Sequence, residues 1–400
     1  MTTETRVKTK TMACDGAIAM SYGVLLSRPE VISMLPITPQ HGLVAQIYQF
    51  HAQGLLDCDM IEAEGELSAM SIVNAASAAG ARTFISSSQA GLFFMWDAFK
   101  MPPGFRLPVV MANFSREEVP PASVVHSQQD IVGAKDQGWI QIYAETCQEC
   151  LDDIIIAYRL AEDTSILLPV IVNVDGFFLS HLTELVEIPA QAEVDRFLAP
   201  LKEMNRPKLV ADTKVLCSVG LQNRDLAQAR YDFWQAMERT KTKIQEIDQE
   251  FARTFGRTYG GMIEEYRCED ADIVLMTMGS VTGTARAVVD AKREEGVKVG
   301  LIKVRVYRPL PSERLLQALK GKKAVGVIDR NVCLGTPWGH VFHDLRSILY
   351  DRDTKLPAVD FIAGIGGLDI TPEQITEAIN ITRQAAQGKK VPEVTWLALE

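Results

Sequence analysis

Two blocks of the sequence alternate short apolar runs with segments of helical spacing. In the first block, residues 107–112 and 167–174 are almost continuously apolar, and helical patterns lie between such runs. Strands that are apolar at every position are buried on both faces, which is typical of a parallel sheet covered by helices. The same alternation restarts at residue 271 and continues to residue 350. The sequence therefore predicts an α/β protein with two doubly wound units.

A long charged segment separates the two blocks. Residues 226–255 have helical spacing with no strand pattern around them, so we expect a connector helix whose charges form a solvated face. A chain of 400 residues also exceeds what one hydrophobic core normally organises. We divide the chain into a first unit (1–186), a helical connector (187–264) and a second, smaller unit (265–400).

Charge and hydropathy narrow the class of partner. The formal net charge is −10, and no cluster of Lys and Arg stands out, which argues against nucleic acid or an anionic membrane as the main partner. No apolar stretch reaches the length of a membrane span, and the apolar run 16–26 lacks the cleavage site of a signal peptide. We expect a cytoplasmic protein that binds a small molecule or another protein.

Seven cysteines are scattered along the chain, which is not a disulfide framework. Only Cys147 and Cys150 have C-x-x-C spacing. This spacing suits a redox pair or half of a metal site, but two ordinary thiols at the start of a helix are the simpler interpretation. An iron–sulfur cluster held by this chain alone would need four well-placed thiolates, so we expect no metal site here.

A carboxylate-rich turn precedes a helical segment of small residues. Glu62, Glu64 and Glu66 fall just before residues 67–80, and a Pro-bounded loop, residues 35–42, lies a short way upstream. Acids are common in the first turn of a solvated helix because the helix dipole favours them. The small residues that follow would also allow a ligand to approach the backbone closely. The residues alone leave both interpretations open.

In this order, the motifs resemble the α chain of the thiamine-diphosphate-dependent 2-oxoacid:acceptor oxidoreductases. The resemblance implies a pyrimidine-side cofactor domain in the first unit and a transketolase-C-terminal-like domain in the second. Residues 136–141 and 175–181 are most similar to the branch that contains oxalate oxidoreductase and phenylglyoxylate dehydrogenase. The matching segments are residues 35–39, 61–66, 78–91, 278–280, 307–311 and 327–330.

The resemblance also implies roles for the acidic turn. In such enzymes one carboxylic acid bonds N1′ of the cofactor's aminopyrimidine and favours its imino tautomer, whose 4′ nitrogen removes the C2 proton. Counting back from residues 78–81, Glu66 falls at this catalytic position, Glu64 is the alternative, and Glu62 is structural. The resemblance places four further residues at the cofactor: Pro36, Ile37, Ser88 and Gln89.

For a 2-oxo acid substrate, the resemblance points to Thr38, Arg116 and Phe114. The planar fork of an arginine matches a carboxylate, although Arg116 could instead pair with Glu117 or Glu118 at the surface. The oxalate-specific branch carries an Arg where this chain has Thr38, which favours a substrate with one carboxylate.

Histidines and aromatic residues give weaker indications. His41 and His126 could each be a proton shuttle or a packing residue. The aromatic residues between Phe93 and Phe114 are expected to fill the core. If several of them line the pocket, an aromatic 2-oxo acid such as phenylglyoxylate would fit.

A diphosphate motif is missing from the sequence. The family pattern implies Mg²⁺ held by Gly-Asp-Gly and a later Asn, whereas Asp15-Gly16 and Asp175-Gly176 lack the leading Gly and Asn205 follows an unsuitable stretch. We therefore expect a β-type subunit to supply the diphosphate and Mg²⁺ site. Subunits of the γ and δ type would carry the [4Fe-4S] clusters.

The sequence thus predicts the α subunit of a CoA-acylating 2-oxoacid oxidoreductase that is active only in a complex. Pyruvate or a branched-chain 2-oxo acid are alternative substrates. Two other classes stay open, a non-catalytic scaffold chain of such a complex and a carboligase that needs no electron acceptor.

Overall fold

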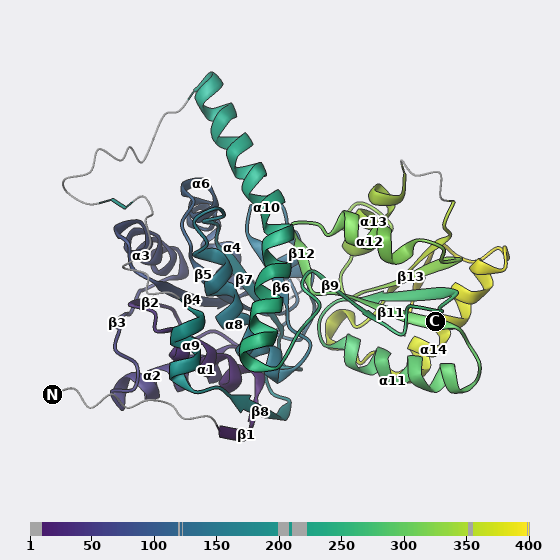
Figure 1. Cartoon of the computed structure of the whole chain (residues 1–400), viewed down its shortest axis with the longest axis horizontal. Helices are drawn as coiled ribbons and strands as arrows, with labels where there is room; N and C mark the ends of the chain where they lie inside the picture. The colour runs from purple at the N-terminus through teal and green to yellow at the C-terminus, as the bar shows by residue number, and fades with distance from the viewer. Residues whose placement is uncertain are drawn as a thin grey trace.

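The computed structural model describes residues 10–118, 121, 123–198, 208–209, 222–350, 355–397 and 399. Within these residues, a seven-stranded and a six-stranded sheet lie on either side of a long helix (Figure 1). A two-stranded sheet completes the fold. The predicted α/β class with two sheet units is confirmed. Asn205 lies outside the described residues.

The first sheet has the order β12-β6-β7-β5-β4-β2-β3 and is parallel except at β12. Every residue of β4, β5, β6 and β7 is buried, which the apolar runs 107–112 and 167–174 predict for β5 and β7. The strands are β2 (Val31–Ser33), β3 (Asp59–Ile61), β4 (Thr83–Ser88), β5 (Val110–Ser115), β6 (Ile140–Tyr143) and β7 (Val170–Asp175). The helices of this unit include α1 (Gly16–Ser27), α2 (His41–Ala52), α3 (Glu66–Ala79), α7 (Gln129–Gly133), α8 (Cys147–Ala161) and α9 (Gln191–Phe197).

Three strands, β1, β8 and β12, were not predicted from the sequence. β1 (Lys10–Asp15) pairs antiparallel with β8 (Thr183–Ile188). β12 (Val306–Arg308) belongs to the second half of the sequence but pairs with the first sheet, where it forms an antiparallel edge strand with Val306 opposite Ile142. The two halves of the chain are therefore joined by a strand as well as by a connector, and the boundary at residue 265 remains a proposal.

The second sheet has the order β15-β14-β13-β10-β11-β9, with only β9 antiparallel to its neighbour. Helices cover both of its faces (Figure 1). The strands are β9 (Ile263–Tyr266), β10 (Ile273–Thr277), β11 (Val299–Val304), β13 (Ala324–Asp329), β14 (Ala358–Ile362) and β15 (Val394–Trp396). The other elements are α11 (Val281–Glu294), α12 (Ser312–Leu319), α13 (His340–Tyr350), the short η2 (Ile365–Gly367) and α14 (Pro372–Ala386).

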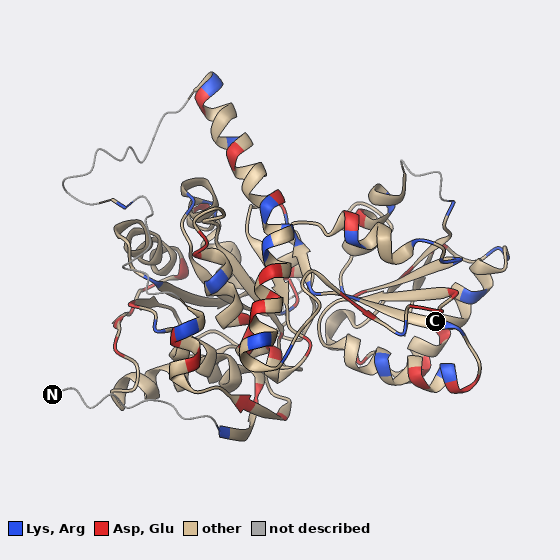
Figure 2. Ribbon diagram, in the orientation of Figure 1, with Lys and Arg blue, Asp and Glu red and all other residues tan. Residues whose placement is uncertain are grey.

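The connector is one helix, α10 (Asn223–Phe255). From Ala236 onward it buries a stripe that includes Ile244 and Phe251, while acidic and basic residues are interspersed along its length (Figure 2). The prediction that the charges of this helix are solvated is wrong at Asp248, which is 1% exposed. Its carboxylate accepts hydrogen bonds from the Thr258 hydroxyl (2.6 Å) and the Tyr259 amide (3.0 Å).

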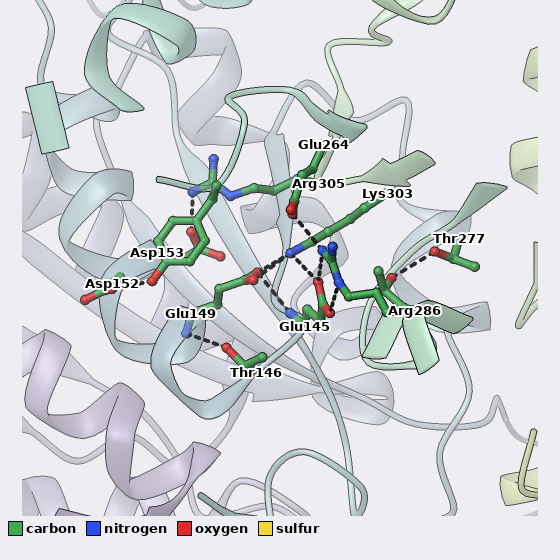
Figure 3. A network of polar contacts seen from close by, with 12 residues as sticks. Glu145, Thr146, Glu149, Asp152, Asp153, Glu264, Thr277, Arg286, Lys303 and Arg305 are labelled. Atoms are coloured by element: carbon green, nitrogen blue, oxygen red, sulfur yellow. Dashed lines mark hydrogen bonds and ion pairs between the residues drawn. The ribbon is translucent and has the colours of Figure 1, made fainter. Parts of the chain in front are cut away.

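A buried network of charges joins α8 to the second half of the chain (Figure 3). Lys303 of β11 is 1% exposed, and its ammonium donates to both carboxylate oxygens of Glu149, at 2.6 and 2.7 Å. The same ammonium lies 2.9 Å from Glu145, which also pairs with Arg286 of α11. One turn further along α8, Asp153 pairs with Arg305. The second sheet is thus fixed to the first unit by buried ion pairs.

The two close cysteines take no part in this network. α8 begins at Cys147 rather than at Cys150, because the Thr146 hydroxyl caps it by accepting from the Glu149 amide. Both thiols are fully buried, and burial raises their pKa above its usual value. This favours the interpretation of two ordinary helix thiols.

Candidate active site

The residues predicted for the site lie at the carboxyl ends of neighbouring strands in the first sheet. β2 leads into the Pro-bounded loop, β4 into Ser88 and Gln89, and β5 into Arg116, and these three strands are adjacent in the order β2-β4-β5. α3 follows the edge strand β3 and begins at Glu66. In open parallel sheets, ligands bind beyond the carboxyl ends of the strands.

Glu66 is held in place by close packing, and its carboxylate has no partner among the described residues. It is the first residue of α3, after Gly65 in an extended conformation, and its side chain is half-buried. A Cβ built on Gly91 would lie 2.7 Å from Glu66 Oε1 and 2.2 Å from Ser87 Oγ, so Gly91 is needed to admit the Glu66 side chain. Within the described part of the chain, no hydrogen-bond donor reaches this carboxylate. It is therefore available to a ligand.

The other two acids of the turn already have partners. Glu64 is exposed and accepts a hydrogen bond of 2.6 Å from the Ser68 hydroxyl, which lowers its pKa. Glu62 is also exposed and accepts from the Tyr48 hydroxyl at 3.1 Å. The geometry therefore favours Glu66 over Glu64 as the residue that meets a cofactor.

Arg116 contacts the Pro-bounded loop through its guanidinium group. It is 8% exposed, and one guanidinium nitrogen donates to the Thr38 carbonyl at 2.6 Å. Its Nε is buried without a partner in the described structure. Burial lowers the pKa of Arg116, while the charges of Asp130 and Glu66 raise it. The alternative of a surface ion pair with the adjacent glutamates is wrong, and an unused donor remains for a ligand.

Asp130, which was not predicted as a site residue, bonds the backbone of Arg116. It is fully buried and accepts hydrogen bonds from the amides of Ile131 (2.7 Å) and Arg116 (3.3 Å). Burial raises its pKa to about 7. No sequence pattern distinguishes it, because the contact depends on how α7 returns to the end of β5.

The remaining predicted site residues divide into accessible and enclosed ones. Gln89 is 3% exposed, and its side-chain oxygen is buried without a partner, whereas the Ser88 hydroxyl donates to the Phe114 carbonyl at 2.8 Å. Pro36 is exposed and Ile37 half-buried. Phe114 has 0% exposure within the core, so the structure contradicts its predicted contact with substrate.

The two histidines singled out in the sequence lie in different environments. His41 is exposed at the start of α2, with its ring 5.8 Å from that of His181. His126 is 3% exposed, and burial, with the charge of Arg330, lowers its pKa to about 4. Its enclosure beside Asp175, whose carboxylate lies 3.6 Å from Nε2, favours a packing role.

A second group of polar residues lies at the junction of the two sheets. Asp175, at the end of β7, accepts hydrogen bonds from the Ser280 amide (2.9 Å) and from Gln128 Nε2 (3.1 Å). The Gly/Ser-rich turn at residues 279–284 could present backbone N–H groups to an anion. Its Ser280 amide is already used by the Asp175 carboxylate. Gly176 packs this junction against the Pro-bounded loop, since a Cβ there would lie 2.7 Å from Pro39 Cγ.

Neither Asp-Gly pair is free to act as a diphosphate motif. Asp175 has the partners just given, and Asp15 caps α1 by accepting from the Ile18 amide at 2.8 Å. Among the described residues, no three His, Cys, Asp or Glu side chains are grouped so as to hold a metal ion.

No helix in the described part of the chain is both long and apolar enough to cross a membrane.

Comparison with known proteins agrees with this geometry. A family model described as the thiamine-diphosphate-binding part of pyruvate flavodoxin/ferredoxin oxidoreductase matches residues 22–249, more than half of the chain. The chain belongs to the 2-oxoacid:ferredoxin oxidoreductase α-subunit family. A second model of this family, the core domain II of pyruvate:ferredoxin oxidoreductase, matches residues 271–375. The predicted family, enzyme class and thiamine diphosphate cofactor are confirmed.

Relatives of this α subunit have several named substrates. Pyruvate synthase subunit PorA of Methanothermobacter thermautotrophicus is 40% identical over 384 residues, with 96% of each chain covered. The α subunit of NADH-dependent phenylglyoxylate dehydrogenase of Aromatoleum evansii is 36% identical, covering 98% of this chain and 95% of its own. Ketoisovalerate oxidoreductase subunit VorA of Pyrococcus horikoshii is 38% identical, with 96% and 97% covered. All three are subunits, so this chain also works with partner subunits.

The fold matches a solved structure of the same enzyme class. The 2-oxoglutarate:ferredoxin oxidoreductase of Magnetococcus marinus aligns with a TM-score of 0.72 and 20% identity, over 92% of this chain and 65% of that one. At this identity the likeness establishes the fold alone, and it confirms the two-unit α/β architecture.

Proposed function

We propose that this chain provides the aminopyrimidine half of a thiamine diphosphate site for the CoA-acylating oxidation of a 2-oxo acid. The observation that carries the proposal is the half-buried Glu66 carboxylate, which is packed against Gly91 and has no donor within the described chain. A carboxyl group placed in this way can share a proton with a ring nitrogen of the cofactor. The experiment that tests this assignment is the Glu66→Ala variant described below.

The residues around Glu66 suit the cofactor and the substrate carboxylate. The orphan side-chain oxygen of Gln89 can accept from an amino group, and the orphan Nε of Arg116 can donate to a carboxylate. When bound, thiamine diphosphate would supply the nucleophilic carbon for the keto group and would stabilise the electron pair that remains when CO₂ leaves. The chain itself binds, orients and shields these groups.

Partner subunits complete the proposed enzyme. The diphosphate and Mg²⁺ site belongs in a β-type subunit, because neither Asp-Gly pair of this chain is available. Apolar side chains on the elements around Glu66 are unusually exposed and suit an interface: Ile61 is 41%, Leu67 41% and Phe94 62% exposed. Iron–sulfur subunits of the γ and δ type receive the electrons, and CoA accepts the acyl group.

A substrate with a single carboxylate fits the described charges best. Arg116 is the one predicted substrate residue that carries a positive charge, and Thr38 stands at the position where the oxalate branch has a second cation. Pyruvate, branched-chain 2-oxo acids and phenylglyoxylate all meet this requirement. A substrate panel on the native complex, with oxalate as the dicarboxylate, distinguishes among them.

Arg116→Lys should lower kcat/KM for the 2-oxo acid by about 10- to 100-fold, because a lysine keeps the charge but loses the fork and the bond to the Thr38 carbonyl. Steady-state kinetics of the reconstituted complex measure this. Glu117→Gln, which changes a neighbouring charge, is the matched control and should stay within about twofold. An unchanged kcat/KM in Arg116→Lys would remove Arg116 from the substrate site.

Thr38→Arg should shift the substrate profile toward a dicarboxylate such as oxalate. The added guanidinium would lie next to Arg116, whose own group already bonds the Thr38 carbonyl, and would provide a second cation. Relative kcat/KM values for oxalate and for the best monocarboxylic substrate measure the shift, with Thr38→Gln as a longer but uncharged control. A profile that is the same in both variants would contradict the argument from Thr38.

A further inference from the structure

A glycine turn of the second unit contacts the segment that follows Arg116. Gly366 and Gly367, in η2, have φ angles of +68° and +77°, which residues with a Cβ rarely adopt. The Gly367 amide donates to the His126 carbonyl at 3.0 Å. A Cβ on Gly367 would lie 2.6 Å from Val125 Cβ, which is closer than two such atoms can pack. Only glycine therefore allows this contact.

Val125 is bonded in turn to the residue next to Arg116. The Glu117 amide donates to the Val125 carbonyl at 2.8 Å. Both atoms belong to the backbone, so this bond does not depend on the Glu117 side chain. The contact of Gly367 with Val125 therefore lies one hydrogen bond away from the backbone that carries Arg116.

Two glutamines continue the contact along the same segment. The Gln128 amide donates to the Arg330 carbonyl at 3.0 Å. Gln129, which is 7% exposed, donates through Nε2 to the Val332 carbonyl and accepts at Oε1 from the Val332 amide, both at 2.9 Å. Arg330 and Val332 follow β13, which is the neighbour of β14 in the second sheet. Two adjacent strand ends of this sheet thus hold residues 125–129.

The bond that Arg116 offers to a substrate depends on how its backbone is held. Its guanidinium donates to the Thr38 carbonyl at 2.6 Å, and its Nε has no partner among the described residues. A bond from this Nε to a carboxylate depends on the direction of the planar fork. A displacement of about 1 Å in a substrate site can cost about 100-fold in activity. A shift of residues 116–117 should therefore weaken substrate binding.

We infer that the second unit positions Arg116 for the substrate carboxylate, with Gly367 as the positioning residue. This inference rests on the proposed function, which assigns that carboxylate to Arg116. Gly367 acts through Val125 and the Glu117 amide, not by contact with the substrate. The second unit thus takes part in substrate recognition as well as in the architecture of the chain.

Gly367→Ala in the reconstituted complex tests this inference. The added Cβ displaces Val125, so KM for the 2-oxo acid should rise about tenfold while kcat stays within about threefold, as expected when a binding contact is lost. Gly366→Ala is the matched control. It has the same left-handed conformation, but its Cβ would meet no atom of the described chain within 4 Å, and its amide keeps the bond of 3.3 Å to the Glu117 carboxylate. Its KM should stay within about twofold of the wild type, and equal KM values in the two variants would overturn the inference.

A double-mutant cycle with Arg116→Lys separates positioning from a general structural role. Arg116→Lys already loses the fork that Gly367 positions, so adding Gly367→Ala should lower kcat/KM by less than about twofold more. Effects of the two substitutions that multiply would overturn the inference.

The same variants distinguish this inference from the proposed function. Exchange of the C2 proton of bound thiamine diphosphate, which reports Glu66, should be as fast in Gly367→Ala as in the wild type, and slower exchange would overturn the inference. An unchanged kcat/KM in Arg116→Lys would refute the substrate role of Arg116 itself. A defective Arg116→Lys beside a normal Gly367→Ala would refute only the role of Gly367.

Gln129→Met is a second test, which applies even if Gly367→Ala does not assemble. It removes both bonds to Val332 and should raise KM by about threefold or more. Gln148→Met is its control, because Gln148 has the same reciprocal pair of bonds with the backbone of Glu187 in β8, at 3.0 and 2.7 Å. Its KM should stay within about twofold of the wild type. An unchanged KM in Gln129→Met would overturn the inference.

Discussion

Replacing Glu66 by alanine should lower the rate of 2-oxo acid decarboxylation by the assembled complex by about 10²- to 10⁴-fold, the usual contribution of a positioned acid or base. The reason is local. The Glu66 carboxylate is the acid of the turn that is held by packing and lacks a donor within the described chain. Substrate-dependent release of CO₂ measures the loss. The subunits should stay together, because alanine removes no contact that the fold depends on.

Glu64→Ala is the matched control for this variant. Glu64 is exposed and already bonded to Ser68, so its removal should leave the rate within about twofold. Glu66→Gln separates the proton from the shape of the side chain, since an amide fits beside Gly91 but does not exchange a proton in the same way. If Glu64→Ala were inactive and Glu66→Ala active, the catalytic assignment would move two residues along the chain.

Lys303→Met should destabilise the fold by about 3–5 kcal/mol, the usual cost of removing one partner from a buried ion pair. Methionine fills much of the volume but leaves Glu149, which is 3% exposed, without the ammonium that now contacts both of its oxygens. Urea unfolding of the purified protein measures the change. Lys292→Met is the control, because Lys292 forms only a surface pair with Glu295 and should cost about 1 kcal/mol at most.

The destabilisation by Lys303→Met should depend on pH. Burial raises the pKa of Glu149 to about 7 even with Lys303 beside it. A carboxyl group whose pKa is higher in the folded than in the unfolded state favours folding at low pH and loses that contribution as pH rises through the folded value. The variant should therefore lose less stability near pH 5 than near pH 8. An equal loss at both pH values would show that Glu149 is not left as a buried charge.

Much of the architecture could be predicted because its signals are local. β5 and β7 overlap the apolar runs 107–112 and 167–174, and α10 has a helical pattern over most of its extent. β12 could not be predicted in the first sheet, because it is only three residues long and pairs with a strand more than 160 positions away. β6 includes Gln141, which is polar yet fully buried, so the pattern of its run is broken.

The candidate site also combines residues that local motifs predict with contacts that only the folded chain brings together. Glu66 and Arg116 were recognisable from motifs, whereas the support that Asp130 gives to Arg116 depends on tertiary contacts. Phe114 was misplaced because an aromatic residue next to a site residue can point either into the pocket or into the core. The acids of α8 resemble a solvated helix face, and only their pairing with distant cations such as Lys303 and Arg305 makes their burial possible.

The most direct test of the account is the exchange rate of the C2 proton of thiamine diphosphate bound in the assembled complex, measured by quenched deuterium labelling without substrate. This rate reports the activation that Glu66 is proposed to provide, before any later step. The account predicts fast exchange in the wild type and in Glu64→Ala, and exchange slowed by about 10²-fold or more in Glu66→Ala with cofactor content unchanged. Equal exchange rates in the wild type and Glu66→Ala would contradict it.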